Sequence, residues 1–297
     1  MSSKTWQAIK ENNYIEQINQ FASLIEEADA IVVGTGAGMS SASGFTYIGN
    51  RFTDNFPDFI EKYNLLDMLQ ASLFDYESLE EFWAFQSRFV IMNFYDQTPG
   101  VTYTDLAEIL KDKNYFIIST NADNRYRLAD YDMDKVFQIQ GQYGLWQCSE
   151  HCHQQTYSDE ATIRKMAAEQ KDMKVPSNLI PYCPKCDAPL EINKRTVEKG
   201  MVEDDDFNEH QRNYQDFLDR HQDKKVLFIE IGVGHTTPQF IKHPFQKMTA
   251  ENENAQYITM NQKHYRIPPA IRDRTSRVDS DIQETLQAVK EKLSGHN

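Results

Sequence analysis

The sequence predicts an α/β fold built on a doubly wound parallel sheet, and three observations lead to this prediction. Short apolar runs rich in β-branched residues recur along the chain, as expected for strands covered on both faces. Amphipathic helical patterns alternate with these runs, and a glycine-rich turn follows the first of them. Alternating strands and helices favour parallel pairing, because each helix carries the chain back across the sheet. We expect strands at residues 31–33, 115–119, 136–139, 225–231 and 257–260.

The first expected strand leads directly into the glycine-rich turn. Gly34, Gly36 and Gly38 allow the backbone to turn tightly and to approach a ligand, because they have no Cβ atom. The Ser-rich helix start that follows offers free N–H groups and a helix dipole, and both favour anions. The usual dinucleotide fingerprint has a further glycine where this chain has Met39. The turn therefore predicts a site for a dinucleotide diphosphate, and a tight turn without a ligand is the alternative.

The expected helices flank the strands and also form one long insertion. Amphipathic patterns over residues 5–28 and 279–293 open and close the chain. Residues 45–100 contain helical patterns and no strand, which indicates an inserted helical module or a lid over the glycine-rich turn. Its aromatic residues have the spacing of a helix face that packs in a core. Helices are expected at 57–73, 77–95 (with Phe82, Trp83, Phe85, Phe89 and Phe94 facing the core), 104–111 and 207–221.

Two polar residues follow the second strand, at the edge where the glycine-rich turn is also expected. Ligands of parallel α/β sheets bind outside the carboxyl ends of the strands, so Asn121 and Asp123 are candidates for the site. The alternative is that both residues only cap the helix that follows.

The four cysteines form two close pairs, Cys148 with Cys152 and Cys183 with Cys186. Two short thiolate turns of this spacing are typical of a closed, tetrahedral structural zinc site. His151 and His153 flank Cys152, but four sulfur ligands already complete such a site. Four free thiols are the alternative.

The composition disfavours several classes of partner. The net charge of −14 opposes binding to nucleic acid or to an anionic membrane. No apolar run is long enough to span a bilayer, and the first residues lack the apolar core of a signal peptide. We therefore expect a soluble, cytoplasmic protein.

Five motifs, in the same order along the chain, resemble those of the sirtuin family. Residues 36–44 (GAGMSSASG) resemble the sirtuin G-A-G-x-S-x-x-S-G turn, and residues 121–123 resemble its N-x-D motif. The two cysteine pairs match the sirtuin zinc ribbon. Residues 232–234 are similar to the later G-T-S motif, and residues 257–261 resemble the strand ending in an asparagine that holds the adenosine ribose.

The resemblance implies a Rossmann-type NAD-binding domain and a smaller zinc-ribbon plus helical domain, with NAD and Zn²⁺ as cofactors. The Rossmann-type domain would comprise residues 1–44, 101–144 and 223–297. The remaining parts would be a helical module at 45–100 and a zinc-binding small domain at 145–222, with Cys148, Cys152, Cys183 and Cys186 as ligands. The implied cofactor-binding residues are Gly36, Ala37, Gly38, Ser40, Ser43, Asn121, Asp123, Gln140, Gly232, Val233, Gly234, Asn261, Asp281 and Ile282.

Three departures from the sirtuin pattern resemble the macrodomain-linked class M sirtuins of microbes. The chain reads FTYIG at 45–49 where sirtuins read I-P-D-F-R, and Asn124-Arg125-Tyr126 where the N-x-D motif usually runs into L-H. Gln140 stands where sirtuins have the histidine of an H-G dipeptide. A histidine can take a proton from a ribose hydroxyl near neutral pH. An amide cannot, so a general-base contribution of roughly 10²–10⁴-fold is missing.

These departures favour ADP-ribosyl transfer over deacylation. Cleavage of the nicotinamide–ribose bond needs positioning and polar contacts more than a base. We therefore hypothesise a protein mono-ADP-ribosyltransferase in which Asn121, Asp123 and Gln140 are catalytic. Resemblance to class M further implies a lipoylated acceptor akin to the glycine-cleavage H protein, and a possible macrodomain partner. The rivals are a deacylase that uses Asp123 or His235 as its base and a catalytically silent NAD-binding sensor.

Overall fold

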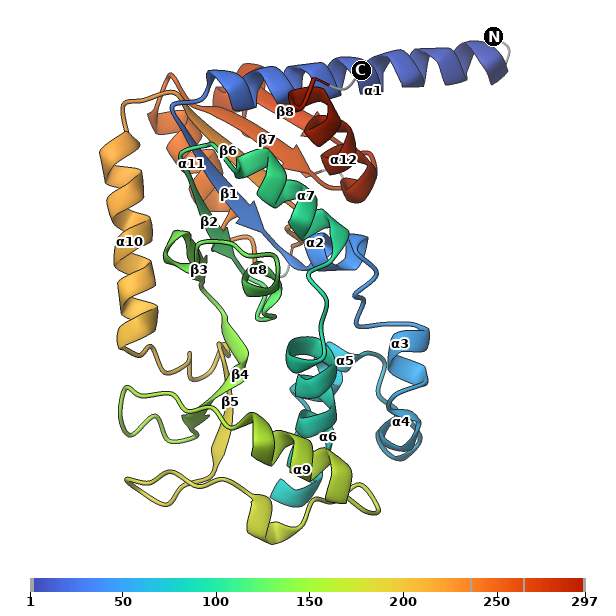
Figure 1. Cartoon of the computed structure of the whole chain (residues 1–297), viewed down its shortest axis with the longest axis vertical. Helices are drawn as coiled ribbons and strands as arrows, with labels where there is room; N and C mark the ends of the chain where they lie inside the picture. Colours follow the sequence, from blue (N-terminus) through green and yellow to red (C-terminus); the bar gives the residue numbers. More distant parts are fainter. Residues whose placement is uncertain (1–2, 236, 264, 296–297) are drawn as a thin grey trace.

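A six-stranded parallel sheet is the main feature of the computed structural model, which describes residues 3–235, 237–263 and 265–295, with side chains from residue 13 onward. The strand order is β3-β2-β1-β6-β7-β8, and every neighbouring pair is parallel (Figure 1). The order reverses at β1, so the loops after β1 and β6 meet at a switch point, where open α/β sheets bind ligands. The strands span Ala30–Thr35 (β1), Tyr115–Ser119 (β2), Val136–Gln138 (β3), Val226–Ile231 (β6), Gln256–Met260 (β7) and Thr275–Val278 (β8).

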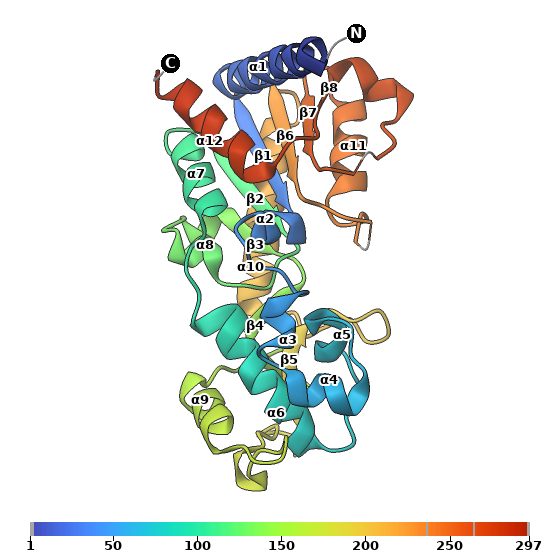
Figure 2. The ribbon, with the colours of Figure 1, turned by 90° about the vertical axis from the view of Figure 1, so that its right-hand side faces the viewer.

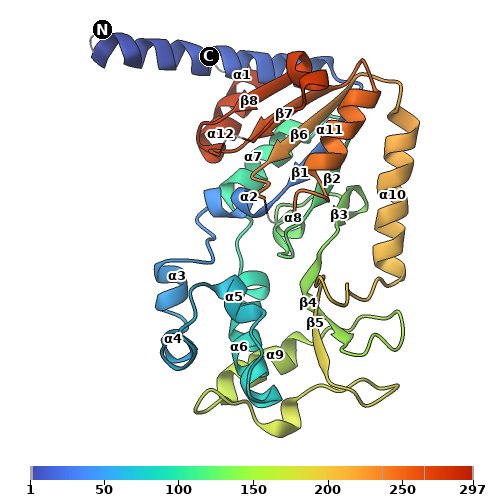
Figure 3. The same ribbon diagram turned by 180° about the vertical axis from the view of Figure 1, so that it is seen from behind.

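Helices cover both faces of this sheet, and together they form what we call the large lobe. Its helices are α1 (Ser3–Glu27), α2 (Ala37–Ala42), α7 (Val101–Leu110), α8 (Arg125–Leu128), α10 (Asp205–His221), α11 (Lys242–Glu251), α12 (Ile282–Leu293) and the 3₁₀ helices η2 (Met133–Lys135) and η4 (Pro269–Arg274). Ile31 and Val33 pack with α1, α7 and α12 on one face. Ala30 and Val32 pack with α10 and α11 on the other face (Figure 3). Because successive strand residues point to opposite faces, β1 is buried at every position, and its first four residues are apolar.

A second group of elements, which we call the small lobe, lies at the other end of the molecule (Figure 2). Its elements are α3 (Asn50–Thr53), α4 (Pro57–Tyr63), α5 (Met68–Ser72), α6 (Leu79–Val90), the π-helix η1 (Ile91–Tyr95), α9 (Glu160–Glu169), the 3₁₀ helix η3 (Ser177–Leu179) and the antiparallel strands β4 (Gly141–Cys148) and β5 (Leu190–Lys194). One apolar core joins the helical insertion to the cysteine-bearing segment. Trp83 and Trp146 meet edge to face in this core, with ring centroids 5.3 Å apart. The expected core aromatics are confirmed: Trp83, Phe85 and Phe89 are buried, and Phe82 and Phe94 pack against them.

We propose two adjustments to the domain limits that the resemblance implied. α10 packs on β2 and β3 of the parallel sheet, so we propose that residues 205–221 belong to the large lobe. The limit at residue 144 falls inside β4, which runs from the parallel sheet into the small lobe. We therefore propose that β4 as a whole belongs to the small lobe.

Several predicted elements needed correction. The single helix expected over residues 57–73 is broken, because Asn64 adopts a left-handed conformation (φ 53°) and Asp67 caps a new helix through the N–H of Gln70. The α-helix expected to continue to Tyr95 changes to a π-helix at Ile91. Strands β4, β5 and β8 were not expected. None of the described helices is long and apolar enough to cross a membrane.

Candidate functional site

The glycine-rich turn after β1 packs directly against the loop after β6. The Gly36 and Gly38 N–H groups donate to the carbonyls of Ile231 and Gly232, both at 3.0 Å. A Cβ atom at Gly38 would lie 2.6 Å from the Gly232 Cα. Gly232 has φ +64°, and a Cβ there would lie 2.5 Å from the Met39 nitrogen. The glycines are therefore required for the contact between the two loops.

This packing limits which backbone groups of the turn can hold a phosphate. The N–H groups of Gly36 and Gly38 are already bonded, so they are not the free donors that the sequence suggested. The Ala37 N–H, at the start of α2, has no hydrogen-bond partner in the described part of the chain. It is the backbone donor of the turn that remains for an anion.

Asn121 and Asp123 lie beside the turn, in one polar cluster with Ser40 and Tyr103. The Asn121 Nδ2 donates to the Gly36 carbonyl (3.1 Å) and to the Tyr103 hydroxyl (3.0 Å). The Ser40 hydroxyl donates to the Asp123 Oδ2 (2.9 Å) and lies 2.7 Å from the Tyr103 hydroxyl. Asn121 is 8 % exposed and Asp123 is 6 % exposed. The expectation that these residues share the edge of the glycine-rich turn is therefore met.

The capping alternative holds only in part. The Asp123 Oδ1 accepts the N–H of Arg125 at 3.3 Å, at the start of α8. The Asn121 side chain, in contrast, is directed to the glycine-rich turn and to Tyr103. Asp123 thus combines a local role with its place in the cluster, whereas Asn121 does not cap the helix.

Burial controls the protonation of this cluster. Removal from water raises the pKa of Asp123, and the nearby Arg125 guanidinium opposes this rise. Burial also raises the pKa of Tyr103 well above its ordinary value and the pKa of Tyr47 to about 12. The tyrosine hydroxyls therefore stay protonated, and Asp123 is the carboxyl group of the cluster, with its pKa raised by burial.

Gln140 lies at the turn that joins β3 to β4, and its main chain is held firmly. Its carbonyl accepts the N–H of Arg195 at 3.1 Å, and the Arg195 Nε donates to the Ile139 carbonyl at 3.2 Å. Gly141 has φ +89°, and a Cβ there would lie 2.3 Å from the Asn193 carbonyl oxygen. The partly exposed Gln140 side chain makes no hydrogen bond within the described part of the chain. Its amide group is therefore available to a ligand.

The described contacts bring no histidine side chain to Asn121, Asp123 or Gln140. The ring of His235 instead packs edge to face on Tyr265, with centroids 4.1 Å apart. Of the two titratable groups considered as replacement bases, Asp123 lies in the cluster and His235 contacts another part of the chain.

The remaining candidate cofactor residues divide into two groups. Ser43 bonds Thr102 of α7 (2.7 Å), and the Asn261 Nδ2 donates to the Val233 carbonyl (3.0 Å), so both lie on loops around the switch point. Val233 is buried, and Gly234 is exposed with no atom within 4 Å of a Cβ built on it. Asp281 caps α12 by accepting the N–H of Glu284 (3.1 Å), and Ile282 is buried in the core. These last two have structural roles of their own, although α12 packs close to α2.

The four cysteines converge as a metal site requires. Their Sγ atoms all lie within 4.8 Å of one another, with Cys148–Cys186 at 3.5 Å and Cys152–Cys183 at 3.6 Å. Four thiolates at about 2.3 Å from a zinc ion would lie about 3.8 Å apart, so the cluster fits a tetrahedral ion. His153 Nδ1 lies 3.0 Å from the Cys152 Sγ, and its Nε2 bonds the Tyr157 hydroxyl at 2.6 Å. Four sulfur ligands would leave no open position on a bound ion, as in a structural site.

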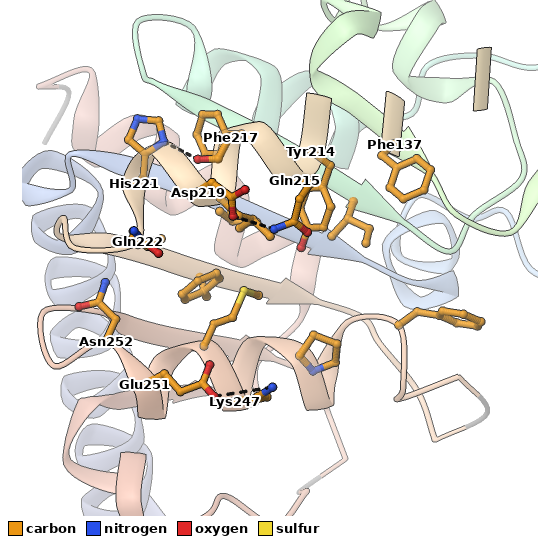
Figure 4. A pocket seen from close by; sticks show the side chains of 18 of the residues that line it. Phe137, Tyr214, Gln215, Phe217, Asp219, His221, Gln222, Lys247, Glu251 and Asn252 are labelled. Atoms are coloured by element: carbon orange, nitrogen blue, oxygen red, sulfur yellow. Dashed lines mark hydrogen bonds and ion pairs between the residues drawn. The ribbon is translucent and has the colours of Figure 1, made fainter. Parts of the chain in front are cut away.

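A cavity of about 830 Å³ lies between α10 and α11, away from the polar cluster of Ser40, Tyr103, Asn121 and Asp123 (Figure 4). Its floor contains Val32 and Phe228 from the middle of the sheet, and its walls include Tyr214 and Met248. None of the candidate site residues lines it. It therefore runs along one face of the sheet and is separate from the switch point.

The comparison with known sequences decides the family. No family model matches the chain. The chain is 55% identical over 288 residues to a protein of Staphylococcus aureus named "Protein ADP-ribosyltransferase", covering 96% of this chain and 91% of the relative. The chain belongs to the protein ADP-ribosyltransferase family. A more distant member, from Fusarium oxysporum f. sp. cubense, is named "Probable bifunctional ADP-ribose hydrolase/ADP-ribosyltransferase". It is 26% identical over 77% of this chain, and the match covers only 39% of that longer protein.

Solved structures show that this member of the family has the sirtuin fold. A structure described as "Sir2-p53 peptide-NAD+" matches 94% of this chain and 99% of its own, with a TM-score of 0.60 and 20% identity. Another, described as "The Structural basis of Sirtuin Substrate Affinity", matches 92% and 98% with a TM-score of 0.61 and 20% identity. The predicted fold class, a Rossmann-type sheet with a smaller cysteine-bearing part, is confirmed.

Sequence reasoning missed three residues that surround the candidate site. Tyr103 lies just before the helix predicted at residues 104–111, although α7 includes it, and it has no motif of its own. Arg195 follows β5, a strand that was not expected. Arg125 was noted only as a departure from a pattern, although a cation next to Asp123 at a buried site was a usable signal.

Proposed function

We propose that this transferase uses NAD as its ADP-ribose donor and transfers a single ADP-ribose to an acceptor protein with release of nicotinamide. The bond between the ribose C1′ and the nicotinamide nitrogen breaks, and its electron pair neutralises the ring nitrogen. A nucleophilic atom of the acceptor forms the new bond at C1′ and loses its proton. The enzyme class follows from the family, and the donor, the residue roles and the acceptor are our proposal.

The polar cluster at the switch point supports specific roles for its residues. Gly36, Ala37, Gly38 and Ser40 would surround the diphosphate, and the unpaired Ala37 N–H would be its backbone donor, because the N–H groups of Gly36 and Gly38 are already bonded. Asn121, held between the turn and Tyr103, would orient the ribose or exclude water. Asp123 would accept a hydrogen bond from the nicotinamide carboxamide. Ser43, Gly232, Val233, Gly234, Asn261, Asp281 and Ile282 would complete the cofactor pocket.

One observation carries the choice of transfer over deacylation. Gln140 offers an unpaired amide side chain on a fixed backbone, where a deacylase would need a base. The amide can bond the ribose hydroxyls while the C1′ bond breaks. It cannot take a proton from these hydroxyls, so the transfer of an acyl group to the ribose lacks its general base.

For the acceptor we propose a lipoylated carrier protein similar to the glycine-cleavage H protein. The support is the resemblance of residues 45–49, 124–126 and 140 to the class M pattern. The Fusarium relative carries an ADP-ribose hydrolase name together with the transferase name, and we propose a macrodomain partner that removes the modification. The four clustered thiols favour a reducing compartment, and we therefore place the protein in the cytoplasm.

The acceptor is tested with paired substrates. The full-length enzyme is incubated with NAD and an H-like carrier, either lipoylated or not, and intact masses and free nicotinamide are measured. We expect one ADP-ribosyl group on the lipoylated carrier, with one nicotinamide released for each. Modification of both forms alike would contradict the lipoyl requirement. Tight NAD binding without any nicotinamide would instead support the sensor.

The role of Asn121 is tested in the same assay. Asn121→Ala removes an amide that fixes the reacting sugar, and we expect nicotinamide release to slow by about 10²-fold. Exposed Asn114→Ala serves as the matched control and should leave the rate unchanged. An Asn121→Ala enzyme as fast as the wild type would remove this residue from the mechanism.

A further inference from the structure

Arg125 is a buried cation beside the candidate site, and the roles proposed above do not use it. It is the first residue of α8, and only 1 % of its surface is exposed. Its Nε lies 3.4 Å from the Asp123 Oδ2 and has no well-formed hydrogen bond. Burying an arginine is costly unless its charge and its donors are satisfied, so the remaining contacts must hold it.

Those contacts reach the two connections that join the helical insertion at residues 50–95 to the large lobe. The Arg125 Nη1 donates to the Thr98 carbonyl at 2.7 Å, and Nη2 donates to the Gln97 side chain. The guanidinium also lies over the ring of Phe45, 3.1 Å from its centroid. Residues 45–49 lead from the large lobe to α3, and residues 96–100 lead back from η1 to α7. One side chain therefore touches Asp123 and both ends of the helical insertion.

A second arginine ties the first connection to the small lobe. The Arg51 Nη1 donates to the Thr46 carbonyl (3.0 Å) and to the Asn93 side chain (2.9 Å). Arg51 Nη2 donates to the Met92 carbonyl at 3.0 Å. The loop that carries Phe45 is thus fixed to η1, so the position of Phe45 depends on the position of the small lobe.

We propose that Arg125 is a positioning residue of the transferase, which holds the Asp123 carboxylate towards the leaving nicotinamide when the connections at residues 45–49 and 96–100 are in place. This inference rests on the role proposed for Asp123. Phe45, Gln97 and Thr98 fix the position of the Arg125 guanidinium, and the guanidinium in turn fixes the Asp123 carboxylate. The arrangement of the lobes therefore determines where the negative charge of Asp123 lies relative to the leaving nicotinamide. A leucine at this position would have no polar side-chain atoms and could make none of these polar contacts.

The charge of Arg125 gives the proposal a pH signature. Burial raises the pKa of Asp123, and Arg125 is the cation that opposes this. The other titratable or charged groups that act on Asp123 or on Arg125 are Tyr47, Arg51, Tyr103, Tyr126 and Tyr143. Burial raises the pKa of each of these tyrosines, so they stay neutral through the working range. Without Arg125, Asp123 should take up a proton at a higher pH.

The test compares the pH dependence of nicotinamide release in three enzymes. In Arg125→Leu we expect the acid limb to move up by about one to three pH units, with much of the rate recovered at alkaline pH. Arg125→Lys keeps the positive charge but loses the planar guanidinium with its several N–H donors. The acid side of its pH–rate profile should therefore stay near that of the wild type, while its rate falls. Arg127→Leu, an exposed position on the same helix, should match the wild type in both respects. An unmoved limb with a uniform loss of rate in Arg125→Leu would overturn the proposal.

Two further variants keep the test decisive if Arg125→Leu does not fold. Gln97→Ala and Phe45→Leu each remove one contact that fixes the Arg125 guanidinium and leave its positive charge in place. The rate of nicotinamide release should therefore fall several-fold, while the acid side of the pH–rate profile does not move. Wild-type rates in both would also overturn the proposal. Asp123→Asn should abolish the acid limb, and a limb that persists would reject Asp123 as the titrating group. A wild-type enzyme that releases no nicotinamide would reject the proposed function itself, which is a different failure.

Discussion

The large lobe and the small lobe are built in different ways. In the large lobe, six parallel strands pair in register, and the central strands β1, β2 and β6 bury both of their faces under helices. In the small lobe, residues 52–95 and 143–192 share one core, which contains many aromatic rings and two of the four cysteines. The large lobe therefore depends on backbone pairing between neighbouring strands, whereas the small lobe depends on long-range side-chain contacts and on a cysteine cluster that fits a zinc ion. The candidate site lies where the two meet, so its geometry depends on both.

The largest expected effect concerns the metal. Structural zinc contributes about 10 kcal/mol or more to the folding of small metal-binding units. Removing it with a chelator should open the small lobe and leave β1 and β6 protected from hydrogen exchange. In a Trp6→Phe background, Trp83 and Trp146 report on the small-lobe core by fluorescence. A Cys183→Ser variant should show the opened state without chelator. Simultaneous loss of protection in both lobes would contradict their independence.

The next effect concerns the contact between two loops of the large lobe. Gly232→Ala forces a Cβ to 2.5 Å from the Met39 nitrogen at φ +64°, and should cost about 3 kcal/mol of unfolding free energy. Urea unfolding followed at β1 and β6 measures this cost, and NAD affinity should fall with it. Gly234→Ala is the matched control for stability, because no atom lies within 4 Å of the Cβ it would add. Equal stability of the two variants would show that the loops do not need to pack so closely.

The smallest effect compares one ion pair in each lobe. The Lys290 Nζ lies 2.5 Å from the Asp105 Oδ1 between α12 and α7, and Asp105 is 4 % exposed. Lys290→Met leaves a buried carboxylate without its partner, which should cost the large lobe about 2 kcal/mol. The pair of Arg164 with Asp96 in the small lobe is exposed, and Arg164→Met should change stability by less than about 0.5 kcal/mol. Thermal unfolding of both variants measures these two losses of stability. Equal losses would contradict the difference expected between the buried and the exposed ion pair.

The sequence predicted the large lobe better than the small lobe, for physical reasons. β1, β2 and β6 are buried on both faces, so their apolar runs stand out. β8 escaped prediction because Thr275, Ser276 and Arg277 are only partly buried at the edge of the sheet. In the small lobe, β4 and β5 are defined by each other and by the cysteine cluster, and neither has a clear local pattern.

The candidate site shows the same division. Asn121 and Asp123 could be assigned from the sequence, because their place at the end of a strand fixes where they lie. The hydrogen bonds that occupy the Gly36 and Gly38 N–H groups come from the loop after β6 and could not be foreseen from the turn itself. The links of Arg125 to Gln97 and Thr98 join segments 27 or 28 residues apart, and no local pattern indicates them.

The products formed by the wild-type enzyme test the account most directly. The enzyme is supplied with NAD, an acylated peptide and a lipoylated carrier, and all products are identified by mass spectrometry, with Gln140→His measured in parallel. The account predicts that the wild type adds ADP-ribose to the carrier and leaves the peptide acylated. O-acyl-ADP-ribose and free peptide formed by the wild type, at a rate similar to the transfer, would contradict it.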